Sequence, residues 1–191
     1  MVAGGFLAAV AAPGRQGRRG RRPGPGIGGN LLLNDSAWYG EKGVRRFGRD
    51  ALAHAGVEQV VVLLGLNDIG FSETREQPTY KPAPVPGAGE VIAGYRALIC
   101  KAHVRGLWAT GSTLLPFGGS DHRGERAARV SREVDAWTRG SGEWDAVVDL
   151  NRIMADPRDP DRLRTEYDFG DRPHPNDRGY GVMAEAVAAS W

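Results

Sequence analysis

The chain has 191 residues, of which 41% are hydrophobic and 25% are charged, and its formal net charge is +2. This length and apolar content suffice for one domain with its own core, and no apolar run approaches the ~18 residues that a transmembrane helix needs. The single cysteine, Cys100, excludes a disulfide framework and a zinc site built from several cysteines.

The positive charge is concentrated at the N-terminus, because residues 1–34 contain five arginines and no acidic residue. An apolar stretch, residues 1–12, precedes these arginines, whereas a secretory signal peptide places its positive charge first. Residues 13–29 are almost wholly Gly, Arg and Pro, a composition that cannot bury enough apolar surface to order itself. The alternative is a nucleic-acid arm, but no aromatic residue interleaves with the arginines. We therefore expect residues 1–25 to be a disordered or aberrant leader, with no credible signal peptide and no nucleic-acid partner.

Regular periodicity begins after this leader. Apolar residues recur at helical spacing over residues 44–55 and stop before Gly56, a typical helix terminator. The branched run at residues 59–65 (QVVVLLG) then indicates a parallel strand that is buried on both faces. A Pro- and Gly-rich linker, residues 78–89, leads to a second helix with its apolar stripe over residues 91–102.

The second half of the chain continues the alternation of strands and helices. We predict a strand over residues 107–115, a helix over 127–137, a strand over 145–150 and a closing helix over 180–191. This order predicts a three-layer α/β domain, residues 26–191, with a parallel sheet covered by helices on both faces. In such sheets the ligand site lies outside the C-terminal ends of the strands.

The tetrapeptide Gly65-Leu66-Asn67-Asp68 follows the most convincing strand. The side-chain amide of Asn67 can donate a hydrogen bond into a cleft without carrying charge, which suits an oxyanion hole. The alternative is that Asn67 and Asp68 only form a turn and cap the next segment.

A glycine-rich turn, Gly26-Ile27-Gly28-Gly29-Asn30, lies earlier in the chain. Its glycines allow a close backbone approach, so an N–H group there could be a second donor. The turn lacks the spacing of a dinucleotide-binding loop and the lysine of a phosphate-binding loop, so we expect no cofactor.

The segment Asp171-Arg172-Pro173-His174-Pro175 is the sharpest signal in the sequence. The two prolines hold His174 on a rigid loop, and Asp171 is close enough in sequence to orient the imidazole as a general base. Two alternatives remain: a capping loop with an exposed histidine, or a metal cluster that adds Asp168 and Asp177. The other histidines and the cysteine are interpreted as surface or packing residues: His54, His103, His122 and Cys100.

Together these motifs resemble the SGNH hydrolases, also called the GDSL esterase/lipase family. The stretches VVVLLGLNDIG, LLPFGGSD and HPNDRGYGVMAEAV are similar to secreted esterases of the actinobacterial type. The resemblance covers about residues 26–191 and implies a flavodoxin-like fold and a serine esterase that acts through an acyl-enzyme. It gives His174 the role of base, Asp171 that of its orienting partner, and Gly29 and Asn67 the oxyanion hole, with no metal. The implied substrate is a small ester of a lipid, an acylated sugar or a short-chain alcohol.

The sequence departs from the family pattern at the nucleophile. No Gly-Asp-Ser triplet precedes the glycine turn, and we identify no nucleophilic serine. Asp35-Ser36 follows the turn instead of preceding it, and five further serines come too late in the chain: Ser72, Ser112, Ser120, Ser131 and Ser141.

From this departure we expect an N-terminally truncated or frame-shifted esterase that lacks its first strands and has little or no activity. The alternatives are a non-catalytic protein that keeps the cleft for ligand binding, or a metal-assisted hydrolase that uses Asp168, Asp171 and His174.

Overall fold

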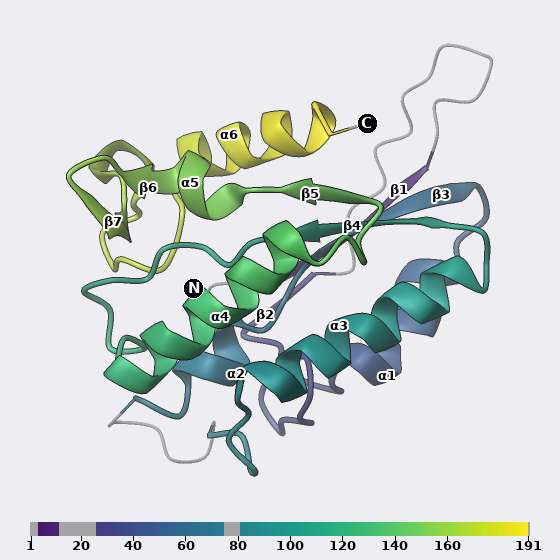
Figure 1. The fold of residues 1–191 in the computed structure, drawn as a ribbon, viewed down its shortest axis with the longest axis horizontal. Coiled ribbons are helices and arrows are strands. Elements are labelled where there is room, and N and C mark those ends of the chain that lie inside the picture. The colour runs from purple at the N-terminus through teal and green to yellow at the C-terminus, as the bar shows by residue number, and fades with distance from the viewer. Residues whose placement is uncertain (1–3, 12–25, 75–80, 191) are drawn as a thin grey trace.

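The computed structural model describes residues 4–11, 26–74 and 81–190, and shows a sheet between two layers of helices (Figure 1). The sheet has five strands in the order β2-β1-β3-β4-β5. Their bounds are β1 (Gly4–Ala11), β2 (Ile27–Gly28), β3 (Val57–Leu63), β4 (Trp108–Ser112) and β5 (Ala146–Val148). The predicted three-layer α/β architecture is confirmed.

Strands β3, β4 and β5 form the parallel part of the sheet. Val60 pairs with Ala109 in the register of β3 and β4, and Thr110 pairs with Ala146 in that of β4 and β5. Residues 60–63 of β3 are all buried, as the continuous apolar run predicts for a strand with helices on both faces. The three strands therefore direct their C-terminal ends to one edge of the sheet.

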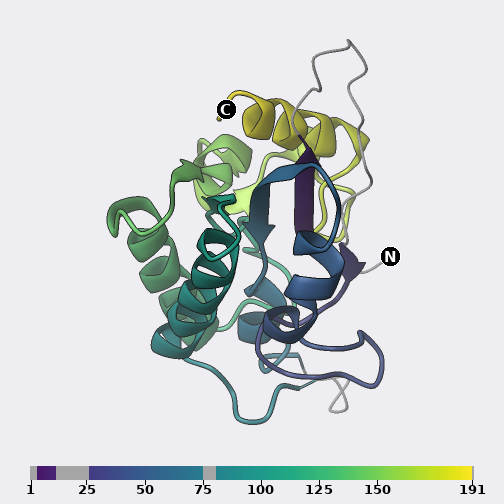
Figure 2. The same cartoon turned by 90° about the vertical axis from the view of Figure 1, so that its right-hand side faces the viewer.

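The prediction of a disordered leader is wrong for residues 4–11, which form β1. This strand runs antiparallel to β3, from the pair Phe6 and Leu63 to the pair Ala11 and Val57, and Figure 2 shows the two strands side by side. The physical reason is that β3 would otherwise present unpaired backbone groups along an apolar edge. An apolar segment of eight residues is long enough to pair with almost the whole of β3. Residues 1–3 and 12–25 of the predicted leader lie outside the described residues.

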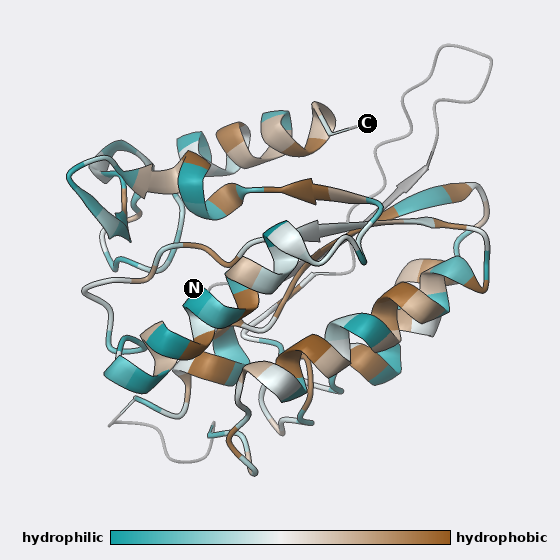
Figure 3. Cartoon of the chain, viewed as in Figure 1, coloured by the Kyte–Doolittle hydropathy of each residue, from teal (hydrophilic) through white to brown (hydrophobic). Residues whose placement is uncertain are grey.

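One face of the sheet is covered by α1 (Gly43–Phe47), α3 (Ala88–His103) and α4 (Glu125–Gly140). A π-helical turn, Gly48–Leu52, extends α1, so the predicted helical periodicity up to Gly56 holds although its hydrogen bonding changes. The larger core lies here, and Figure 3 shows apolar residues along α3. In it, Tyr95 and Trp137 pack around Trp144, whose ring fills the space that a side chain at Gly111 would need.

The opposite face is covered by α5 (Leu150–Met154) and α6 (Asp177–Ala188). A smaller core lies between them and the sheet, with Leu63, Val148 and Met183 among its buried residues. Asn176 caps α6, because its Oδ1 accepts a hydrogen bond of 3.0 Å from the Gly179 amide. The end of the predicted closing helix, Trp191, lies outside the described residues.

Short elements at the C-terminal edge of the sheet complete the domain and were not predicted. Helix α2 (Leu66–Gly70) follows β3, and the hairpin of β6 (Ala155–Asp156) and β7 (Asp159–Leu163) follows α5. Each is too short to produce a periodic pattern in the sequence. Since α2, α5 and the start of α6 gather on this side, the edge is built from the segments that carry the predicted motifs (Figure 1).

Candidate functional site

The glycine turn is held in place by a buried polar network. Gly29 has a φ of +74°, and a Cβ at this position would lie 2.4 Å from the ring of Tyr39. Both observations require glycine here. The side chain of the next residue, Asn30, is fully buried and donates hydrogen bonds to the carbonyl oxygens of Tyr39 (2.7 Å) and Glu41 (2.9 Å).

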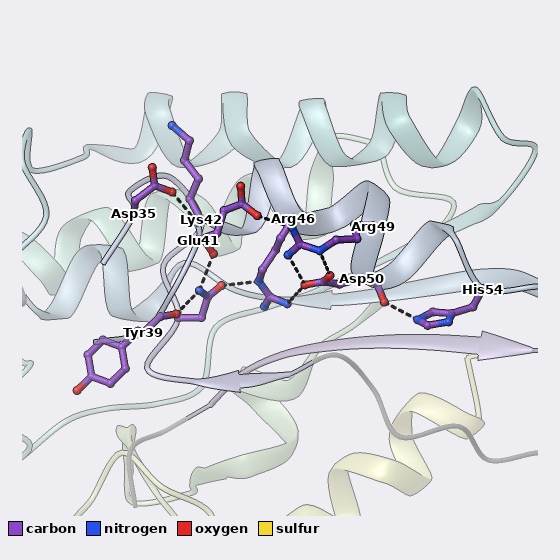
Figure 4. Close-up of polar contacts among 9 residues, drawn as sticks. Asp35, Tyr39, Glu41, Lys42, Arg46, Arg49, Asp50 and His54 are labelled. Carbon is purple, nitrogen blue, oxygen red and sulfur yellow. Dashed lines mark hydrogen bonds and ion pairs between the residues drawn. The ribbon is translucent and has the colours of Figure 1, made fainter. Parts of the chain in front are cut away.

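Arg46 supports this network from α1. Its guanidinium is 1% exposed, donates to Asn30 Oδ1 (3.0 Å) and forms an ion pair with Asp50 (3.3 Å). Figure 4 shows Arg46 in the middle of these contacts, between Tyr39 and Asp50. A buried charge of this kind is tolerated only when it is paired and hydrogen-bonded. Contacts from α1 through Arg46 and Asn30 therefore hold the turn that carries Gly29 in place.

Asp68 ties the glycine turn to α2. Its carboxylate is fully buried and accepts hydrogen bonds from the backbone amides of Leu32 (2.6 Å) and Leu33 (2.9 Å). Burial raises the pKa of Asp68 to about 6, and the two amide donors limit this rise. Asp68 therefore does not cap α2, whose start has no side-chain cap hydrogen bond, but joins two segments 35 residues apart.

Asn67 lies at the start of α2, next to the same turn. It is 5% exposed, and its Nδ2 donates to the backbone carbonyl oxygen of Asn30 at 3.1 Å. The helix begins at Gly65, whose φ of +110° turns the chain sharply out of β3. The structure therefore brings Asn67 to within one residue of Gly29, the two predicted oxyanion donors.

The loop before α6 carries the second predicted pair. An isolated bridge between Asp168 and Pro175 closes the loop, and the Asp168 carboxylate accepts from the amides of Gly170 (2.7 Å) and Arg172 (3.1 Å). Arg172 has a φ of +74°, a conformation that residues other than glycine rarely adopt. Such strain persists where the surroundings determine the backbone, and it is common at functional sites.

Within this loop Asp171 contacts His174 twice. One carboxylate oxygen accepts from the His174 amide (3.2 Å), and the other forms a short hydrogen bond with the ring Nδ1. The imidazole is 14% exposed, and its Nε2 is buried without a hydrogen-bond partner in the described part of the chain. An imidazole oriented through Nδ1 with an unused Nε2 can take a proton from a hydroxyl group that binds there.

The alternative of a metal cluster is not supported by this geometry. The Asp168 carboxylate accepts hydrogen bonds from the loop's own amides, and the described residues contain no group of three His, Cys, Asp or Glu side chains that could hold a metal ion.

None of the described helices has the length and apolar content to cross a membrane.

Ring contacts connect the glycine turn to the far side of α2. Tyr39, which packs on Gly29, stacks on Phe71 with ring centroids 5.4 Å apart, and Phe71 contacts His122 at 5.2 Å. His122 interacts electrostatically with His174 and Asp171. The sequence did not predict this position for His122; its only signal was its place in the loop that follows β4.

Comparison with known proteins identifies the family of this chain. Residues 7–182 match the GDSL-like Lipase/Acylhydrolase family, and the match therefore begins inside β1. No curated protein matches the sequence significantly.

Solved structures share the fold. A protein described as a lipolytic protein of the G-D-S-L family, from Desulfitobacterium hafniense, has a TM-score of 0.59 and 18% identity, over 77% of this chain and 72% of that one. A GDSL-like lipase from Bacteroides thetaiotaomicron has a TM-score of 0.60 and 17% identity, over 76% and 67% of the two chains. The fold of this chain is therefore similar to that of the SGNH hydrolases.

Proposed function

The chain belongs to the GDSL-like Lipase/Acylhydrolase family, and we propose that it is an ester hydrolase in which His174 is the general base. The observation that carries this proposal is the His174 ring, held by Asp171 through Nδ1 while Nε2 is buried and unpartnered within the described residues. In the proposed reaction Nε2 takes the proton of an attacking hydroxyl group as its oxygen bonds to the ester carbon. The protonated ring then returns the proton to the departing alcohol as the ester bond breaks.

Gly29 and Asn67 are the proposed donors to the negative charge that develops on the carbonyl oxygen. Their support is that Asn67 Nδ2 lies 3.1 Å from the carbonyl oxygen of the residue after Gly29, with both residues fixed by buried contacts. Fixed donors matter because each is worth about 10²–10³ in rate when it faces the charge of the transition state. The proposed substrate is a small ester of a lipid, an acylated sugar or a short-chain alcohol, and no cofactor takes part.

We further propose that the chain as given is impaired. Its sequence contains no Gly-Asp-Ser triplet, and none of the described serines donates to His174 Nε2. Ser72 and Ser120, for example, donate to backbone carbonyl oxygens three residues earlier. Oxyanion donors and binding alone still give roughly 10³–10⁴ over water in serine proteases. The same unpartnered Nε2 favours a second candidate, a non-catalytic protein that binds esters beside His174.

The test is the hydrolysis of a short-chain p-nitrophenyl ester by the chain and by His174→Ala. We expect slow hydrolysis above the buffer rate that His174→Ala lowers further, because the base is lost while the oxyanion donors remain. His103→Ala is the matched control, since His103 is an exposed histidine that contacts Asp145 away from the site. Ester binding without any hydrolysis would favour the non-catalytic candidate. Robust turnover that survives His174→Ala would contradict the assignment of the base.

A further inference from the structure

His122 is a second histidine beside the proposed base and has no role in the reaction described so far. Its side chain is 17% exposed, and neither ring nitrogen makes a hydrogen bond in the described part of the chain. Nδ1 lies 2.8 Å from Oδ1 of Asp121, but the carboxylate is not placed for a hydrogen bond to the buried nitrogen. A largely buried imidazole with unused hydrogen-bonding capacity requires an explanation.

The position of His122 is determined by its neighbours on α2. Its Cβ lies 2.8 Å from where a Cβ at Gly70 would be, so any larger residue at position 70 would displace the ring. Phe71 covers one side of the ring with centroids 5.2 Å apart. Since α2 also carries Asn67, His122 is fixed relative to a proposed oxyanion donor.

The loop of His122 also packs against the loop of His174. A Cβ at Gly119 would lie 2.7 Å from Nη1 of Arg172, which is two residues from His174. Burial lowers the pKa of the His122 ring, Asp121 opposes this effect, and the charge of His174 lowers the pKa further. The lowered pKa favours the neutral ring, and a neutral imidazole offers one donor and one acceptor.

The chemistry of the base indicates which part of the ester would lie near His122. A general base of this kind returns its proton to the departing alcohol, so the groups around its Nε2 surround the alcohol part of the ester. A neutral ring with a free donor and acceptor suits a hydroxyl group, which is both. A hydrocarbon alcohol would cover the ring without offering it a hydrogen bond, at a cost that a hydroxylated alcohol avoids.

We propose that His122 is a specificity-determining residue that hydrogen-bonds a second hydroxyl group of the leaving alcohol, so that the site favours esters of polyhydroxylated alcohols over alkyl esters. This inference rests on the proposed ester hydrolysis and names its substrate class. It concerns binding of the alcohol and adds no covalent step to the reaction.

The test compares two acetyl esters with the same carbon skeleton, glycerol monoacetate and n-propyl acetate. We expect the ratio of their kcat/KM values to fall about tenfold in His122→Phe, because one neutral hydrogen bond is lost while the ring contact with Phe71 is kept. His122→Gln, which retains a donor and an acceptor, should keep most of the ratio and controls for damage to the fold. His54→Phe, a change at an exposed histidine on another surface, should leave the ratio unchanged. An unchanged ratio in His122→Phe, with turnover present, would overturn the inference and leave the proposed function standing.

A binding measurement separates the two proposals if neither ester is hydrolysed. The chain has four histidines, so the imidazole NMR signal of His122 is identified by its absence in His122→Phe. We expect millimolar glycerol monoacetate to shift this signal and n-propyl acetate to shift it clearly less. That result without turnover would refute ester hydrolysis and support the role of His122 in recognising the alcohol. Equal shifts, or none, would overturn the role of His122.

Discussion

Asp135 shows how a single buried carboxylate costs this protein stability. It is 3% exposed on α4, and its only hydrogen bond in the described structure is from the Leu114 amide to Oδ1, at 2.8 Å. Burial raises the pKa of Asp135 to about 7, an effect that nearby Arg139 only partly offsets. The folded protein therefore binds this proton more tightly than the unfolded chain, whose aspartate pKa is close to 3.8. Ionisation of Asp135 destabilises the fold as pH rises from about 4 to 7.

We predict that Asp135→Asn stabilises the protein at neutral pH. The asparagine oxygen can accept the same hydrogen bond from Leu114, and its amide can point into the cavity of about 350 Å³ that Asp135 lines. The free energy of unfolding at pH 8 should rise by on the order of 2 kcal/mol, because the buried charge is removed. Denaturant unfolding at several pH values measures this gain, which should vanish below pH 4, where the aspartate is protonated in both states. A gain that is constant over pH would show that charge burial is not its cause.

At the scale of elements, β1 is the strand that the sequence did not predict and on which the edge of β3 depends. Ala8 pairs with Val61 and Ala9 with Val60 in the antiparallel register. Successive amides of a strand point to opposite sides, so only one of these two alanines directs its N–H at β3. Proline removes that N–H and the ladder hydrogen bond that it makes.

We therefore predict that Ala8→Pro and Ala9→Pro differ sharply in their effect on the free energy of unfolding. One of them should lower the free energy of unfolding by about 3 kcal/mol, and the other should have a smaller effect because its N–H faces away from β3. Amide hydrogen exchange in β3, at residues 60–62, reads out the pairing directly, and protection should be lost mainly in the first variant. If both variants keep full protection of β3, the pairing of β1 with β3 would be refuted.

At the scale of the whole molecule, the sequence predicted those features that depend on residues close together in the chain. The continuous apolar run of β3 and the long stripes of α3 and α4 were read from the sequence because burial acts over few residues. The contact between Asp171 and His174 was predicted for the same reason, since three residues separate them.

Features that depend on distant partners could not be predicted in this way. The antiparallel direction of β1 is set by the open edge of β3, some 50 residues later in the chain. The approach of Asn67 to Asn30 and the contact of His122 with α2 likewise arise only when the sheet has assembled. Helix α2 is one turn long and is held from α4, where Arg126 donates to the Ile69 carbonyl oxygen at 3.0 Å.

We propose that the chain combines a His174–Asp171 base with oxyanion donors but lacks a serine placed to be acylated. The most direct measurement is the pre-steady-state release of p-nitrophenol after the protein is mixed with excess p-nitrophenyl acetate. An enzyme that is acylated on a serine releases the phenol in a rapid burst of up to one equivalent per site before the slower steady state. We predict a slow, linear release with no burst, which becomes slower still in His174→Ala. A stoichiometric burst that persists in Cys100→Ala and His174→Ala would contradict this proposal, because neither the exposed thiol nor the imidazole could then account for the acylation.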